Sequence, residues 1–234
     1  MSLTLACAGA ANADSFSAGQ FTTYSQNDWG SGVAGQALLL ADYNSVFAPT
    51  NQVLVAGVEG VPGEYFLAFD SATDVLDFLP QGGTPSALTG NLYNPTAAST
   101  GIIGGDVIGL TLNVDFSNAG FLHGTSTTPF SDLILTNFTG SLSGLNGMTV
   151  DQFLLNVADP CLAGGPCPYG VANTETVIAD LNNPFESGTV STFADTNLES
   201  PSSTAPMPEP SSLLVLGSSL AGLAFVLRRR VVRA

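Results

Sequence analysis

Side chains that could carry out covalent catalysis are few and isolated in this sequence. A catalytic serine needs a neighbouring base, and His123 is the only histidine in the chain. It lies in residues 122–128, where glycine, serine and threonine predict a solvated loop. The chain has no lysine, which excludes a lysine base or a Schiff base. We therefore predict a non-enzymatic protein without catalytic residues.

Two glycine-containing segments resemble functional loops but lack the residues that such loops need. Residues 140–144 have Leu142 where a nucleophile elbow requires its serine. Residues 101–105 have the glycines of a phosphate-binding loop, but the surrounding sequence offers no lysine or arginine to neutralise phosphate. We predict a close-packed turn at residues 101–105.

Carboxylates are the main groups of the chain that could take part in catalysis or metal binding. Asp74 follows Asp70 closely and is explained as the first-turn acid of a helix. Asp115 opens a partial calcium-loop pattern, but Ala119 and Ser126 stand where a ligand and a bidentate acid belong. We therefore predict no metal site and no cofactor. A pair of acids for glycoside hydrolysis would meet only in the fold, so a secreted hydrolase is a third, weaker hypothesis.

The distribution of charge restricts the partners of the protein. The sequence has 19 acidic and four basic residues, and all four arginines lie among the last seven positions. Residues 14–206 therefore have 18 acids and no lysine or arginine. Nucleic-acid binding requires cations that displace counterions from phosphate, so we predict no nucleic-acid partner.

Local signals predict several helices and strands. The capping-box spacing at residues 71–74 and 149–152 predicts helices over 71–79 and 149–158, each ended by a proline. Further helices are predicted over residues 33–47, over residues 84–92, and around residues 177–181. Strands are predicted over residues 21–24, 53–58 and 65–69.

Residues 99–116 fit both a strand and a helix. Apolar residues alternate with polar residues or glycine from Ile108 to Phe116, as in a strand, while Ile103, Val107 and Leu110 fall on one helical face. We favour a helix because the stretch is long for a strand. The predicted fold class is α+β: a mainly helical single exported domain with a small antiparallel sheet. An all-β surface domain is the alternative.

The C-terminal residues have the composition of a linker, an apolar span and a cationic end. Residues 201–210 are rich in proline and serine and predict a linker. Residues 211–227 are uncharged and would extend about 25 Å as a transmembrane helix, although a buried terminal helix is the alternative. The positive-inside rule then keeps the arginines in the cytoplasm and everything before Pro210 outside it. The apolar residues of the predicted anchor are Leu213, Leu214, Val215, Leu216, Leu220, Leu223, Phe225, Val226 and Leu227. The arginines predicted to retain the tail are Arg228, Arg229, Arg230 and Arg233.

This arrangement resembles a known bacterial sorting signal. Pro208-Glu209-Pro210, a short apolar span and a terminal arginine cluster are similar to the PEP-CTERM signal, over residues 207–233. Met207 departs from the pattern, because a β-branched residue more usually precedes the first proline. The resemblance implies recognition by exosortase, a membrane-embedded enzyme expected to cut near the motif. It also implies bacteria that make exopolysaccharide, which becomes a further expected partner.

The N-terminal residues agree with export. Residues 1–13 are uncharged and mostly small or apolar, and they end in Ala11-Asn12-Ala13, a signal-peptidase pattern. We predict cleavage between Ala13 and Asp14. The predicted organisation is a remnant signal peptide (1–13), an acidic globular domain (14–200), a linker (201–210), a transmembrane helix (211–227) and a cytoplasmic tail (228–234). The protein would reside in the inner membrane with its body in the periplasm, and at the cell surface or outside the cell after processing.

Two cysteines remain in the predicted mature chain. Cys161 and Cys167 lie in a segment whose prolines and glycines predict a turn. In an oxidising compartment we expect them to form a disulfide, which stabilises the fold by roughly 2 kcal/mol. Metal binding is the rival interpretation, but it requires more soft ligands than two thiols.

The function predicted for the body is a structural or matrix role. The alternative is a carbohydrate-binding or adhesive module, with Trp29, Tyr24 and Tyr43 as candidate sugar-stacking aromatics. Packing in the core is the commoner use of such residues.

Overall fold

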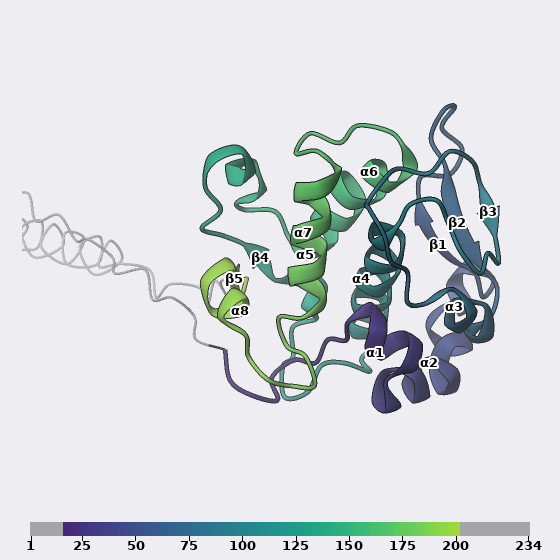
Figure 1. The fold of residues 1–234 in the computed structure, drawn as a ribbon. Coiled ribbons are helices and arrows are strands. Elements are labelled where there is room, and N and C mark those ends of the chain that lie inside the picture. Colours follow the sequence, from purple (N-terminus) through teal and green to yellow (C-terminus); the bar gives the residue numbers. More distant parts are fainter. Residues whose placement is uncertain (1–15, 202–234) are drawn as a thin grey trace, which may run out of the picture. The chain divides into compact units, whose positions relative to one another are not determined.

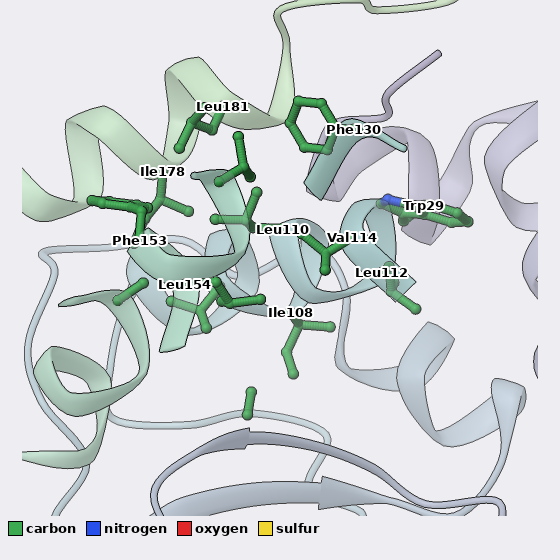
Figure 2. Close-up of a cluster of buried hydrophobic side chains, with 14 of the residues drawn as sticks. Trp29, Ile108, Leu110, Leu112, Val114, Phe130, Phe153, Leu154, Ile178 and Leu181 are labelled. Carbon is green, nitrogen blue, oxygen red and sulfur yellow. The ribbon is translucent and has the colours of Figure 1, made fainter. Parts of the chain in front are cut away.

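A long buried helix, α4 (Ile102–Asn118), runs through the middle of the chain (Figure 1). The structure is a computed structural model that describes residues 16–201. Fourteen of the 17 residues of α4 are buried, so neighbours must cover it on every side. Figure 2 shows Leu110, Leu112 and Val114 leaving α4 in different directions. The helix favoured for residues 99–116 is confirmed.

The elements around α4 are mostly helical. It contacts α1 (Gln26–Ser31), α7 (Val171–Asn182), the short 3₁₀ helix η2 (Phe130–Asp132) and strand β1 (Leu54–Gly57). Further helices are α2 (Val33–Val46), α3 (Ala72–Phe78), α8 (Thr192–Asn197) and the 3₁₀ helices η1 (Ala48–Thr50) and η3 (Gly140–Leu145). The fold is α+β, and the all-β alternative is wrong.

The sheets are small, and the larger one is mixed rather than antiparallel as predicted. Strand β1 pairs antiparallel with β2 (Phe66–Phe69), and β2 pairs parallel with β3 (Leu92–Tyr93), in the order β1-β2-β3. The chain passes through α3 between β2 and β3, and such a crossover returns a strand in the parallel sense. A second sheet pairs β4 (Ile134–Leu135) antiparallel with β5 (Leu198–Glu199).

Sequence signals for helix starts predicted the helices correctly where hydrogen bonds to distant residues did not replace the helical ones. The Ser71 hydroxyl accepts a hydrogen bond from the Asp74 backbone N–H at the start of α3, and predictions for α2 and α7 are also confirmed. The helix predicted over residues 84–92 is wrong. There the Ser86 and Leu88 N–H groups donate to the Thr100 and Leu162 carbonyls, so distant partners replace helical ones.

Two predicted strands are confirmed as β1 and β2, but the strand predicted over residues 21–24 is wrong. That segment has a single bridge, from Thr23 to Glu186. The Tyr24 N–H donates instead to the side chain of Asn113, 2.9 Å away. A side chain of α4 thus takes the place of a partner strand.

The helix that begins with the Thr149–Gln152 capping box continues past its predicted end. The capping box is present, and α5 (Val150–Phe153) passes through a π-helical segment, η4 (Leu154–Ala158), into α6 (Asp159–Ala163). Pro160 does not stop the helix; it lies at the start of α6, directly after the π-helical segment η4. Cys161 is therefore helical, in place of the predicted turn.

Gly101 permits a close approach at the start of α4. It has φ +62°, and a Cβ atom there would lie 2.1 Å from the Thr84 carbonyl oxygen. Gly105 likewise faces Gln26, since an added Cβ would lie 1.8 Å from Gln26 Oε1. Residues 101–105 are closely packed as predicted, but they form a helix start rather than a turn.

We expect Gly101→Ala to lower the free energy of unfolding by about 3 kcal/mol, because it combines an unfavourable φ with a backbone clash. Chemical denaturation followed by circular dichroism measures this loss. Gly82→Ala is the matched control, since a Cβ atom at Gly82 meets nothing within 4 Å. Equal effects of the two substitutions would contradict this account of Gly101.

Among residues 16–201, no helix combines the length and the apolar character needed to cross a membrane.

Candidate functional site

Asn113 of α4 is a fully buried hub that joins three segments of the chain. Its Oδ1 accepts hydrogen bonds from the Tyr24 N–H (2.9 Å) and from Trp29 Nε1 (3.3 Å). Its Nδ2 donates to the Tyr24 carbonyl (2.8 Å) and to Asn182 Oδ1 (3.1 Å). With these four bonds the side-chain amide has satisfied its donors and its acceptor, so Asn113 is a structural residue.

Asp106 lies two turns earlier on the same face of α4, and its carboxyl is poorly satisfied. The residue is 5 % exposed, and its Oδ2 atom has no hydrogen-bond partner among the described residues. Asn182 Nδ2 donates to the Asp106 backbone carbonyl, 2.9 Å away, and so links the residue to the Asn113 hub. Asp106 is therefore the buried end of a polar network that crosses from α4 to α7.

The surroundings of Asp106 favour its protonated form. Burial raises the pKa of its carboxyl from 3.8 to about 7, and the negative charge of Glu175 on α7 adds to the rise. The side-chain amides of Gln26 and Asn182 lower the same pKa, although neither reaches Oδ2 in hydrogen-bonding geometry. Near neutral pH, Asp106 can thus hold or release a proton.

A second group of acids lies on the opposite side of α4. Asp159, at the start of α6, is 8 % exposed and accepts a hydrogen bond from the Gly57 N–H, 2.8 Å away. Burial raises its pKa to about 7 despite that hydrogen bond, and the charges of Asp115 and Asp151 raise it further. Burial also raises the pKa of Asp115 to about 6, with a contribution from Asp151.

These acids have no cationic neighbours within the described chain. Of the 19 acidic residues, all but Asp14 and Glu209 lie in residues 16–201, which contain no lysine or arginine. Within that range, no group of three or more histidine, cysteine or acidic residues is arranged to hold a metal ion. Asp115, which begins the partial calcium pattern, lies inside α4 rather than in a loop. Protons are therefore the simplest means of neutralising the buried carboxyls.

The candidate sugar-stacking aromatics belong to the core. Trp29 and Tyr43 are 0 % and 2 % exposed, so neither offers a face to a ligand. The Tyr43 hydroxyl donates to the Phe69 carbonyl, 2.7 Å away. The ring of Tyr24 packs edge-on against Trp29, with 5.2 Å between ring centroids. For Trp29 and Tyr43 the assignment to carbohydrate stacking is wrong, because burial removes the surface that a sugar would contact, whereas Tyr24 is partly buried.

His123 lies in the loop between α4 and η2, in agreement with the predicted loop. Its Nε2 atom is nonetheless buried, and no hydrogen-bond partner reaches it from the described residues. The hydroxyl of the nearby Ser126 donates to the Thr128 carbonyl rather than to the imidazole. The structure brings no serine hydroxyl to His123 in this loop.

The cysteine pair lies where α6 meets the loop that follows it. The Sγ atoms of Cys161 and Cys167 are 1.91 Å apart, which is disulfide distance. Cys161 is buried in α6, while Cys167 is partly exposed beside Thr174 of α7. The pair connects the last helical turn of α6 with the segment that leads into α7.

The predicted sorting and processing residues lie outside the described residues. These are the cleavage site Ala13–Asp14, the motif Pro208-Glu209-Pro210, the apolar span 211–227 and the arginines of residues 228–233. The described chain ends at Pro201, two residues after β5.

Reasoning from the sequence missed Asp106, Asn113 and Asn182. Asp106 and Asn113 were visible as polar residues seven positions apart in an otherwise apolar run, a spacing that repeats on one helix face. Comparison with known proteins found no matching family model, no matching curated protein and no matching solved structure.

Proposed function

We propose that this protein is exported, anchored in the inner membrane through residues 211–227, and sorted by exosortase to the cell surface or the exopolysaccharide matrix. There the body has a structural, non-enzymatic role. The observation that carries the proposal is the three-part order of the tail: Pro208-Glu209-Pro210, an uncharged apolar span, and the arginines that follow it.

The position at which the described fold ends supports cleavage near this motif. Leu198 is buried, and β5 pairs with β4 through Leu198–Leu135 and Glu199–Ile134. The compact unit ends at Pro201, seven residues before Pro208. Cleavage near the motif would therefore leave residues 16–201, and with them the pairing of β4 with β5, in the released body.

The composition of the body agrees with a location outside the cytoplasm. Cys161 and Cys167 lie at disulfide distance, and disulfides persist in oxidising compartments. The 17 acids of residues 16–201, without lysine or arginine, keep copies of the body apart by repulsion. That charge favours a role as a soluble surface component that does not self-associate.

The motif itself supplies the decisive test. Replacing Pro208, Glu209 and Pro210 by alanine leaves the apolar span and the arginines intact, so the chain should remain anchored but unprocessed. Full-length protein should then accumulate in the inner membrane of a host that has exosortase, as detected by fractionation with an antibody to the body.

The matched control replaces Ser202, Ser203 and Thr204 by alanine, three substitutions in the same linker outside the motif. This variant should be processed like the unaltered chain. If the motif variant is also processed and sorted normally, the tail is an ordinary membrane anchor and the sorting assignment is wrong.

A further inference from the structure

Tyr93 of β3 is the most exposed aromatic side chain among residues 16–201. It is 70 % exposed, whereas Phe121, the other exposed aromatic of that range, is 40 % exposed. The Tyr93 ring stands perpendicular to the ring of Phe66 on β2, with 5.3 Å between ring centroids. Because Phe66 is itself buried, it holds the Tyr93 ring from one side and leaves the rest of the ring open to solvent.

The pairing of the strands directs Tyr93 away from the core. Tyr93 lies opposite Ala68, and Ala68 lies opposite Val55, so these three residues share one face of the sheet. Leu92 points to the other face and packs against the core. In Figure 1, β3 is the outermost strand at one end of the described fold, and β5 lies at the other end. The open face of Tyr93 is therefore remote from Pro201, where the described chain ends.

Two exposed asparagines flank Tyr93, and each is fixed by a hydrogen bond to the neighbouring strand. Asn91 Oδ1 accepts from the Phe66 N–H, 3.3 Å away, and Asn94 Oδ1 accepts from the Asp70 N–H, 3.1 Å away. Because a backbone N–H can only donate, each amide must turn its oxygen to the strand, which leaves its Nδ2 donor group for another partner. Both donors are thus oriented before a ligand binds, and this lowers the entropy cost of binding.

An open aromatic ring between fixed amide donors matches the chemistry of a sugar. The C–H groups on one face of a sugar ring pack against an aromatic ring, and the hydroxyls at its rim both donate and accept hydrogen bonds. The Asn91 and Asn94 amides supply donors for those hydroxyls. Asp70, exposed directly after β2, supplies a carboxylate acceptor.

Charge restricts the class of sugar polymer. Residues 16–201 contain 17 acids and no lysine or arginine, so the body repels a polyanion at every orientation. Asp70 adds a negative charge beside Tyr93 itself, and no cation of the described chain offsets it. An uncharged polysaccharide meets no such repulsion.

We propose that Tyr93, Asn91, Asn94 and Asp70 form a binding site for an uncharged polysaccharide. One sugar ring stacks on Tyr93, and its hydroxyls bond to the two amides and to the carboxylate. The inference rests on the proposed function for the setting in which the body meets a polysaccharide. A polymer presents the same sugar many times, so many copies of a site that binds one ring weakly still hold the protein to a matrix.

Native gel electrophoresis through gels that contain a polysaccharide tests the site, because binding slows the protein in proportion to affinity. The full chain is purified in a zwitterionic detergent, since an alkyl glycoside would compete for the site. The uncharged probes are dextran, mannan and galactomannan, and the acidic probe is alginate. We expect at least one uncharged probe to retard the protein and alginate to leave its mobility unchanged.

Substitutions at Tyr93 separate stacking from general adhesion. Tyr93→Ala should weaken binding about tenfold, whereas Tyr93→Trp keeps a flat ring and should stay within about twofold of the unaltered chain. Asn94→Gly removes one amide while retaining the positive φ of 46° at that position, and should weaken binding about threefold. The matched control is Phe121→Ala, which removes the exposed aromatic after α4 and should leave binding unchanged.

Four results would overturn the proposal: no retardation by any of the three uncharged probes, stronger retardation by alginate, full binding by Tyr93→Ala, or an equal loss in Phe121→Ala. The last would indicate non-specific adhesion through exposed apolar groups. None of these measurements involves exosortase or the Pro208-Glu209-Pro210 motif. Failure of this site is therefore distinguished from failure of the sorting proposal, which the motif variant tests by fractionation.

Discussion

Asn113→Leu should lower the free energy of unfolding by about 4 kcal/mol or more, enough to unfold a marginal domain. The substitution leaves four buried or partly buried groups without their bonds to Asn113: the Tyr24 N–H and carbonyl, Trp29 Nε1, and Asn182 Oδ1. Each unsatisfied group costs about 1–3 kcal/mol, and leucine is nearly isosteric with asparagine, so lost packing contributes little.

Denaturant titration of the full chain in detergent, followed by tryptophan fluorescence, measures the loss, because Trp29 is both the reporter and one of the partners. The matched control is Asn173→Leu. Asn173 is exposed on α7 and bonds only locally, to the Tyr169 carbonyl 3.0 Å away. The control should change stability by no more than about 0.5 kcal/mol. Similar losses in the two variants would show that Asn113 is not a hub.

The free energy of unfolding should rise by several kcal/mol as the pH falls from about 8 to about 5. Burial raises the pKa of Asp106 and of Asp159 to about 7 and that of Asp115 to about 6, all above the ordinary 3.8. Between those values the folded state binds more protons than the unfolded state. Stability is therefore greatest on the acidic side of this window and falls as the pH rises through it.

The magnitude of this pH effect follows from the individual carboxyls. A pKa that moves from 3.8 to about 7 corresponds to about 4 kcal/mol between the two protonation states. Asp159→Asn keeps an oxygen to accept the Gly57 N–H and removes the titration, so it should flatten the profile. Asp77→Asn, at an exposed position of α3, should leave the profile unchanged. A stability maximum at or above pH 8 in the unaltered chain would contradict the prediction.

Elements whose determinants are local could be predicted from the sequence. The Thr149–Gln152 capping box and the Ser71 cap each use residues within one turn of helix, and both begin helices in the structure. Helix α4 could be predicted from its length and periodicity although it contains three glycines. In each case the bonds that fix the backbone are made by neighbours in the chain.

Elements fixed by distant partners could not be predicted. Strands β4 and β5 are two residues long and separated by more than 60 residues, so no local pattern marks them. The error at residues 84–92 has the same origin, because the Leu88 N–H finds its partner at Leu162. The geometry of these loops and strands depends on which distant segments pack against them. The sequence alone does not show which segments those are.

The candidate site could likewise be predicted from the sequence only where its pattern is local. Asp106 and Asn113 were detectable as polar residues in an apolar run, and that pattern indicates a buried polar face on one helix. Their common partner Asn182 lies about 70 residues later, on a helix whose contact with α4 is purely tertiary. The sequence shows that residues 16–201 have no lysine or arginine, but this matters because the fold buries several carboxyls, and that burial could not be predicted from the sequence.

The short pairing of β4 with β5 determines how the body would respond to mechanical load. In a molecule held by its C-terminal tail, a pulling force enters at Pro201 and reaches the Glu199–Ile134 pair first, then Leu198–Leu135. Those pairs would bear the load before it reached α8. Helix α4 and its hub lie far upstream of that point in the chain, so the loss of the strand pair and of the buried Leu198 would precede any loss of the central helix.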